Sequence, residues 1–248
     1  MTIERLLEKK YNIKNNEAKE IIDLIEKYKT EKEKKKLNIK IPKYSLGEEL
    51  FNSISHGIGA LAAVAYLVLM AVKAKGPLAE TTVSLFGSTM IILYTLSCIY
   101  HALSPSLEGK KVLRVLDHCN VYLLVFGTYI PVALLGVGGP LGWTLFGIVA
   151  GVTILGIVFT SIGIDKFQVV EVICHLINGW SILFGVSKLM NTMGFNGVLF
   201  LLLGGVVYTI GSILYGVGSK KKYMHSVFHM FCIVGTLFHF FAVYLYLL

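Results

Sequence analysis

The strongest constraint on this chain is a series of apolar stretches, each about 20 residues long, that recur from residue 50 to the last residue. A helix of 20 residues rises about 30 Å, which is the thickness of the hydrocarbon core of a bilayer. Short segments rich in Gly, Pro, Ser or Lys separate the stretches. The pattern predicts an all-α integral membrane protein, a bundle of seven transmembrane helices over residues 52–74, 79–103, 113–136, 141–163, 168–188, 196–218 and 224–247.

Charge is concentrated at the N-terminal end. Of the 248 residues, 55% are hydrophobic and 15% are charged, and residues 1–49 hold 13 of the 23 Lys and Arg and 10 of the 15 Asp and Glu. The sequence therefore predicts a charged, amphipathic helical tail over residues 1–44, in the cytosol, followed by a membrane domain over residues 45–248. Because the tail carries mixed charge, nucleic-acid binding is not expected.

The basic residues of the connecting segments predict the orientation of the chain. Cytoplasmic loops of membrane proteins are enriched in Lys and Arg. The second, fourth and sixth connections carry seven basic residues, and the first, third and fifth carry three; the seven are Lys110, Lys111, Arg114, Lys166 and Lys220 to Lys222, and the three are Lys73, Lys75 and Lys188. This asymmetry predicts a cytoplasmic N-terminus and an external C-terminus in a multi-pass protein of the cell membrane.

Five polar residues lie at the ends of predicted spans on the cytoplasmic side. Ser97 and His101 are four residues apart at the end of the second span, and His225 and His229 have the same spacing at the start of the seventh. Residues four apart share one face of a helix. Asp117 lies one turn into the third span. Because ionisable groups are costly in a bilayer, their agreement in depth indicates a functional site.

Three histidines and a nearby carboxylate favour a zinc site. Three neutral imidazoles with a fourth position open are typical of catalytic rather than structural zinc. The simpler alternative for His225 and His229 is a pair of interfacial histidines beside the lysine cluster, and the agreement with His101, Asp117 and Ser97 is the reason to prefer a metal. The four cysteines have no C-x-x-C spacing and are interpreted as small core residues.

Several motifs in order resemble the haemolysin III family, the bacterial branch of the progestin and adipoQ receptor superfamily. The resemblance covers about residues 45–248 and is carried by residues 49–56, 97–101, 117–131 and 225–229. It implies a seven-helix bundle with a cytoplasmic N-terminus and zinc held by His101, His225 and His229. It further implies that Asp117 reaches the zinc through water and that Ser97 lies nearby.

Four other sets of polar residues receive weaker predictions. Near the first span, Glu49, Asn52 and His56 are interpreted as groups that support the site from outside it or pack the helices.

Farther along the chain, His118 is expected to face away from Asp117, because successive helical residues are 100° apart. Glu171 and His175 are expected to form an internal hydrogen-bonded pair, with a second metal site as the alternative. His239 follows His229 by ten residues, about 15 Å along a helix, and should not share the ion.

These features support two main hypotheses and one weaker one. The first is a zinc-dependent hydrolase of a membrane lipid amide or ester, with Asp117 as general base and Ser97 stabilising the oxyanion. The second is a regulator or receptor-like protein in which zinc only joins two helices. A cytolytic pore is the third, and it is disfavoured because the outer halves of the spans are apolar throughout.

Overall fold

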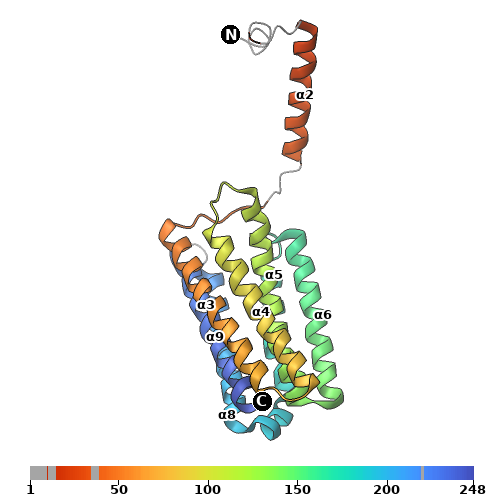
Figure 1. Ribbon diagram of the computed structural model, residues 1–248, viewed down its shortest axis with the longest axis vertical. Helices are drawn as coiled ribbons and strands as arrows, with labels where there is room; N and C mark the ends of the chain where they lie inside the picture. The colour runs from red at the N-terminus through yellow and green to blue at the C-terminus, as the bar shows by residue number, and fades with distance from the viewer. Residues whose placement is uncertain (1–9, 11–14, 35–38, 219–220) are drawn as a thin grey trace. The chain divides into compact units, whose positions relative to one another are not determined.

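The computed structural model describes residues 10, 15–34, 39–218 and 221–248, and within these residues it contains helices and no strand (Figure 1). The chain divides into two compact units, residues 1–38 and 39–248. In the first unit, α2 (Asn15–Lys34) lies inside the helical tail that the sequence predicts over residues 1–44. Residues 39–44 of that predicted tail are not helical, and its other residues, apart from Lys10, lie outside the described residues.

The second unit is a bundle of long helices. Its elements are α3 (Leu46–Lys73), α4 (Pro77–Ala102), α5 (Glu108–Pro131), the π-helical turn η1 (Val132–Val137), α6 (Gly139–Gly163), α7 (Gln168–Trp180), the 3₁₀ turn η2 (Ser181–Gly185), α8 (Val186–Gly218) and α9 (Met224–Tyr246). Within the described residues, six segments are long and apolar enough to span a membrane: residues 46–73, 77–102, 108–137, 139–163, 168–216 and 224–246. The predicted class, an all-helical membrane protein, is confirmed.

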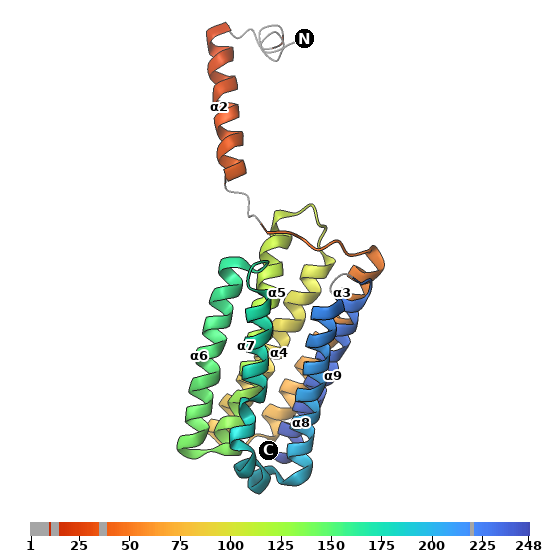
Figure 2. The same ribbon diagram turned by 180° about the vertical axis from the view of Figure 1, so that it is seen from behind.

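One of these segments, residues 168–216, covers two spans that the sequence separates, 168–188 and 196–218. It is not one straight helix. The turn η2 follows α7, and Gly194 within α8 has φ 66° and ψ −179°, a conformation that glycine adopts far more readily than other residues. Figure 2 shows α7 and α8 beside each other on the same side of the bundle.

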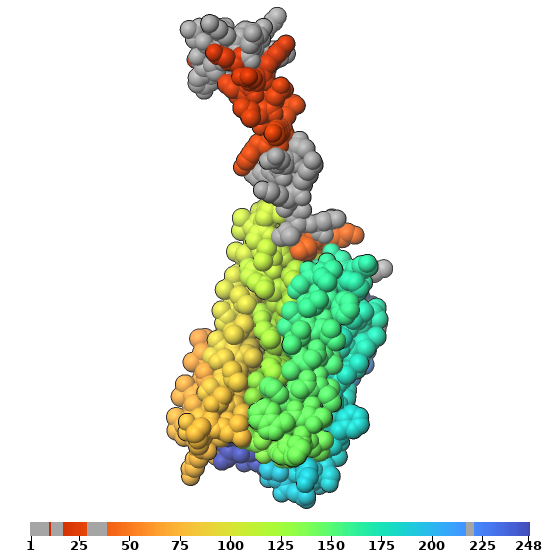
Figure 3. All heavy atoms as spheres, turned by 90° about the vertical axis from the view of Figure 1, so that its right-hand side faces the viewer, coloured from red at the N-terminus to blue at the C-terminus, as the bar shows by residue number. Residues whose placement is uncertain are grey.

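The bundle buries an apolar core and leaves apolar side chains on its surface. Phe86, Met90 and Leu124 are buried in the core, whereas Val72 and Ile162 are 82% and 72% exposed. A surface of this kind suits contact with lipid. Figure 3 shows α6 running along one outer face beside α4 and α5. All four cysteines are free, and Cys119 and Cys232 are buried.

The segment 39–45 crosses the end of the bundle at which α3 begins (Figures 1 and 2). Its last residue, Ser45, is the N-cap of α3 and forms a capping box with Glu48: the Glu48 amide donates to Ser45 Oγ, and the Ser45 amide donates to Glu48 Oε2. Such reciprocal bonds satisfy two amides at a helix start. This end of the bundle contains the candidate site.

Candidate metal centre

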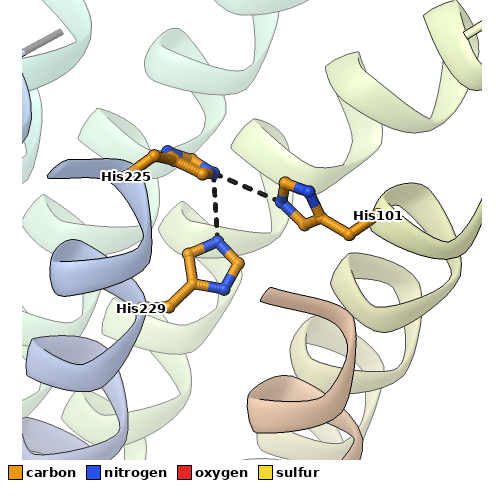
Figure 4. A group of neighbouring side chains, drawn as sticks. All are labelled: His101, His225 and His229. Atoms are coloured by element: carbon orange, nitrogen blue, oxygen red, sulfur yellow. Dashed lines mark hydrogen bonds between the residues drawn. The ribbon is translucent and has the colours of Figure 1, made fainter. Parts of the chain in front are cut away.

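Three imidazoles from two helices meet at one point (Figure 4). His101 is in the last turn of α4, and His225 and His229 are in the first two turns of α9. The Nε2 atom of His225 lies 3.2 Å from Nε2 of His101 and 3.0 Å from Nε2 of His229. One nitrogen from each ring lies within 4.8 Å of those of the other two, and His101 and His229 are buried.

This arrangement could hold a metal ion. Nitrogen ligands about 2.0–2.1 Å from a tetrahedral zinc lie about 3.4 Å from one another. The two Nε2 separations, 3.2 and 3.0 Å, are close to that value, so small rotations of the rings would complete the geometry. The predicted His101, His225 and His229 therefore come together as a possible metal-binding group.

The start of α9 is fixed to α3, and this fixes His225. Tyr223 precedes α9 with φ 62°, a left-handed conformation, and its backbone amide donates a 2.6 Å hydrogen bond to Glu48 Oε1. The carbonyl of Tyr223 accepts the amide of Val227, which closes the first helical turn. Tyr223, two residues before His225, thus fixes where α9 begins.

A carboxylate and a buried lysine orient His101. Nδ1 of His101 donates to Glu49 Oε2 at 2.6 Å, and Lys110 Nζ donates to Glu49 Oε1 at 2.6 Å and to the Leu103 carbonyl at 2.7 Å. The bond to Nδ1 leaves Nε2 of His101 facing the other two rings, as is usual for metal-binding histidines. Glu49 supports the site from outside it, as its sequence interpretation suggested. Lys110 was counted only as a loop cation, yet its side chain is fully buried.

Two more rings lie against the histidines. Tyr44 stacks on His225, with ring centroids 5.0 Å apart and planes 17° apart, and His56 stacks on His229 at 3.7 Å and 18°. Among the described residues, Nδ1 of His225 and Nδ1 of His229 have no hydrogen-bond partner. Stacking on Tyr44 and His56 therefore helps to orient these two rings. Of the three residues near the first span, Asn52 is buried and His56 contacts the site through its ring.

An ion pair holds the segment that carries Tyr44. Arg114 Nη1 donates to the Lys40 carbonyl at 2.6 Å and to Asp165 Oδ1 at 2.8 Å, and the Lys40 amide donates to Asp165 Oδ2 at 3.2 Å. Burial alone would raise the pKa of Asp165, but these hydrogen bonds outweigh it and lower the pKa below its usual range. Burial raises the pKa of Tyr44, so its hydroxyl stays neutral at physiological pH.

Asp117 and Ser97 border a cavity beside the three histidines. The cavity has a volume of about 360 Å³, and its walls include both of these residues together with His225, His229 and His56. Asp117 is 8% exposed, and Ser97 Oγ is buried with no hydrogen-bond partner among the described residues. Their predicted catalytic roles remain predictions, and their place beside the possible metal ligands is the geometry that those roles require.

Two expectations about neighbouring polar residues were wrong. His118 does not face elsewhere: it borders the same cavity, and its Nδ1 lies 2.8 Å from Glu171 Oε1. His175 lies farther from Glu171, with Nε2 4.0 Å from Oε1, so the hydrogen bond expected inside α7 joins α5 and α7 instead. As expected, His239 lies outside the histidine group; its Nε2 donates to the Leu201 carbonyl at 3.2 Å.

A second, smaller cavity of about 80 Å³ continues from the first toward His239. The two cavities have six wall residues in common: Leu93, Val121, His175, Ser212, Phe228 and Cys232. The walls of the second cavity combine aliphatic residues such as Leu124 and Leu201 with aromatic and polar residues such as Tyr129, Thr128 and His239. Together they form a space with mainly apolar walls throughout, in which the ionisable side chains gather in the part beside the histidines.

Comparison with known proteins identifies the family of this chain. A family model described as haemolysin-III related matches residues 44–240. The chain is 35% identical to Hemolysin-3 of Bacillus cereus over 205 residues, which cover 81% of this chain and 92% of that protein. It is 32% identical to the Hemolysin-3 homolog of Bacillus subtilis (strain 168) over 206 residues, covering 82% and 96%.

A more distant human relative, the monocyte to macrophage differentiation factor, is 25% identical over 179 residues, covering 68% of this chain and 71% of that protein. The family match covers most of the chain and includes every residue of the histidine group. We conclude that the chain belongs to the haemolysin III family of multi-pass membrane proteins.

Proposed function

We propose that this protein is a zinc-dependent hydrolase of a membrane lipid amide or ester. The observation that carries the proposal is that Asp117, Ser97, His225 and His229 border one cavity of about 360 Å³, with His101 beside the other two histidines. A metal ion that only joined α4 to α9 would need no cavity beside it, nor a carboxylate and a hydroxyl on the wall of that cavity.

Zinc is the metal that suits these ligands best. Three imidazole nitrogens that leave one tetrahedral position open form the ligand set of catalytic zinc sites. When bound, zinc supplies Lewis acidity: it polarises a carbonyl and lowers the pKa of a coordinated water to about 7. His101, His225 and His229 would hold it, and Glu49 would keep His101 in the tautomer that presents Nε2.

Asp117 and Ser97 would perform the remaining steps. The carboxylate of Asp117 accepts the proton of the attacking water and returns it to the leaving amine or alkoxide. The hydroxyl of Ser97, which is buried beside Asp117, donates to the oxygen on which negative charge develops. Both groups border the cavity, so a bound carbonyl can reach them.

The expected substrate class is a lipid, because the cavity lies inside a membrane bundle and continues into an apolar space. Each buried methylene of an acyl chain contributes about 0.8 kcal/mol to binding. An acyl chain in the deeper cavity would place its carbonyl in the polar part of the space, beside the histidines.

The proposed topology has seven crossings, a cytoplasmic N-terminus and an external C-terminus. It treats residues 168–216 as two crossings, supported by the break at Gly194 and by the length of 49 residues, about twice what one crossing needs. The loop charges support the orientation. The metal centre then lies on the cytoplasmic side of the membrane.

A second candidate function is a non-enzymatic regulator in which zinc only joins α4 to α9. The regulator is favoured by the direct contact of His101 in α4 with His225 in α9, two residues that are 124 positions apart in the sequence. The two functions differ in what Asp117 must do.

The test is the Asp117→Asn variant, which has nearly the same shape without the basic carboxylate. We expect it to keep zinc, with affinity weakened at most about 10- to 100-fold, and to slow hydrolysis by about 10² to 10⁴. Asp23→Asn, the same change on an exposed position of α2, is the matched control and should alter neither property. Each protein is assayed with zinc content measured, against ceramides, acyl amides and phospholipids.

The hydrolase proposal fails if zinc-loaded wild type releases no fatty acid from any of these lipids. It also fails if Asp117→Asn releases fatty acid as fast as wild type. Either result leaves the regulator as the better account of the metal centre.

A further inference from the structure

The cavity beside the histidines has a second polar wall that the proposed chemistry does not use. Glu171 and His175 lie one helical turn apart on α7, and His118 faces them from α5; all three border the cavity of about 360 Å³. The Tyr215 ring contacts both groups, with its centroid 5.5 Å from that of His225 and 6.4 Å from that of His118. This second group is therefore separated from the metal centre by about one aromatic ring.

Hydrogen-bonding capacity on this wall is unused. His118 Nδ1 occupies Glu171 Oε1, and no other described residue hydrogen-bonds to the Glu171 carboxylate. Both ring nitrogens of His175 are buried and have no hydrogen-bond partner among the described residues. A buried polar atom left without a partner costs about 1–3 kcal/mol, so a molecule that satisfies these atoms would be held there.

The orientation of the wall is fixed by its neighbours. The His175 ring stacks on Tyr122, with centroids 3.9 Å apart and planes 25° apart, and the Tyr122 hydroxyl donates to the Glu171 carbonyl at 3.3 Å. The hydrogen bond to His118 fixes the Glu171 carboxylate in the same way. Groups held in place before a ligand arrives lose little freedom on binding.

The chemistry of the wall selects what it can bind. A carboxylate oxygen accepts a hydrogen bond, and a neutral imidazole offers one donor and one acceptor. A hydroxyl both donates and accepts, so it can satisfy Glu171 and His175 together, whereas a methyl group can satisfy neither. A second metal is less suitable, because the described residues show only one close metal-binding group and it does not include these three.

We propose that Glu171 and His175, with Glu171 positioned by His118, form a subsite that binds a hydroxyl group in the polar part of the lipid. The subsite would select lipids that carry a hydroxyl close to the carbonyl over those that do not. It rests on the proposed function only in treating the bound lipid as a substrate; the binding preference itself requires no hydrolysis.

The test compares two amides of equal size, N-hexadecanoyl ethanolamine and N-hexadecanoyl propylamine, which differ only in a terminal hydroxyl or methyl group. Dissociation constants are measured on the purified full-length protein, both metal-loaded and after chelation. We expect wild type to bind the hydroxyl lipid about 10- to 100-fold more tightly, the usual effect of a hydrogen bond to a charged group.

Two variants locate the preference. Glu171→Gln keeps the shape and a bond to His118 but loses the charge, and His175→Phe keeps a ring against Tyr122 but loses both nitrogens. We expect each to reduce the preference to within about threefold. Ser212→Ala, which removes a hydroxyl from another wall of the same cavity, is the matched control and should retain the full preference.

The proposal is overturned if wild type binds the two lipids equally, which would mean that water alone satisfies this wall. It is also overturned if Glu171→Gln and His175→Phe keep the wild-type preference. The first comparison uses no variant, so it stands even if a variant does not fold. A preference that persists after chelation in a protein with no hydrolytic activity would support the subsite while the hydrolase proposal fails.

Discussion

The contact between Glu49 and His101 gives a prediction whose size can be worked out from the structure. Glu49→Gln keeps the side-chain shape but removes the charge that accepts from His101 Nδ1 and Lys110 Nζ, each at 2.6 Å. Loss of such a group typically weakens metal binding about 10- to 100-fold, which equals about 1.4 to 2.7 kcal/mol.

Linkage between binding and folding converts this loss into a change in stability. A metal at a free concentration 1,000 times its dissociation constant stabilises the folded protein by about 4.1 kcal/mol, and at 100 times by about 2.7 kcal/mol. At the same zinc concentration, Glu49→Gln should therefore show about 1.4 to 2.7 kcal/mol less metal-dependent stabilisation than wild type.

Lys110 requires its own control, because Glu49→Gln leaves its fully buried ammonium group without a carboxylate. Such an unpaired charge costs stability even without metal. Lys110→Met removes the ammonium and leaves Glu49 bonded to His101, so it should keep most of the affinity for zinc. The double variant Glu49→Gln, Lys110→Met should recover metal-free stability but not zinc affinity.

The assay measures zinc affinity by competition with a chelator, and thermal unfolding in buffers with and without zinc. Equal zinc affinity in Glu49→Gln and wild type would refute the idea that this carboxylate orients His101. A loss of stability that is the same with and without zinc would show that Glu49 only neutralises Lys110.

Three further predictions concern the three histidines, the ion pair that holds segment 39–45, and the topology. The double variant His225→Ala, His229→Ala should lose its zinc, measured as metal per chain, whereas His239→Ala should keep it; full zinc in the double variant would exclude this ligand set. The contacts that lower the pKa of Asp165 stabilise the fold fully above its unfolded-state pKa of about 4, and this stabilisation is lost as pH falls through the lower folded-state pKa. Asp165→Asn should therefore flatten the fall in thermal stability below about pH 5, and an unchanged fall would contradict the reasoning. A reporter fused after Leu248 should be active only outside the cytoplasm, and cytoplasmic activity would refute the proposed topology.

Spacing along single helices predicted much of the site. Residues four apart must share a helical face, and for that reason Ser97 with His101, and His225 with His229, could be placed from sequence. The convergence of His101 with the α9 pair followed from placing helix ends at one depth. The structure brings the three rings together as this reasoning requires.

Contacts between helices were not predictable in the same way. Periodicity shows which face a residue occupies but not which neighbour meets it. Lys110 looked like a loop cation, yet it bonds Glu49, 61 residues earlier in the chain. His118 was expected to turn away from the site, but the cavity extends far enough around α5 to include both it and Asp117. The two spans expected over residues 168–218 form one apolar segment, broken by a 3₁₀ turn and by Gly194.

The position of the three histidines at one end of the bundle determines from which side a metal ion could reach them. Segment 39–45 crosses that same end, and Tyr44 lies against His225. An ion entering from the opposite side would have to cross nearly the whole apolar length of the helices, where no water can solvate it. Any metal ion held by these histidines would therefore exchange with the compartment that segment 39–45 faces. A chelator confined to the other compartment would leave the loaded protein unchanged, however strongly it bound the ion.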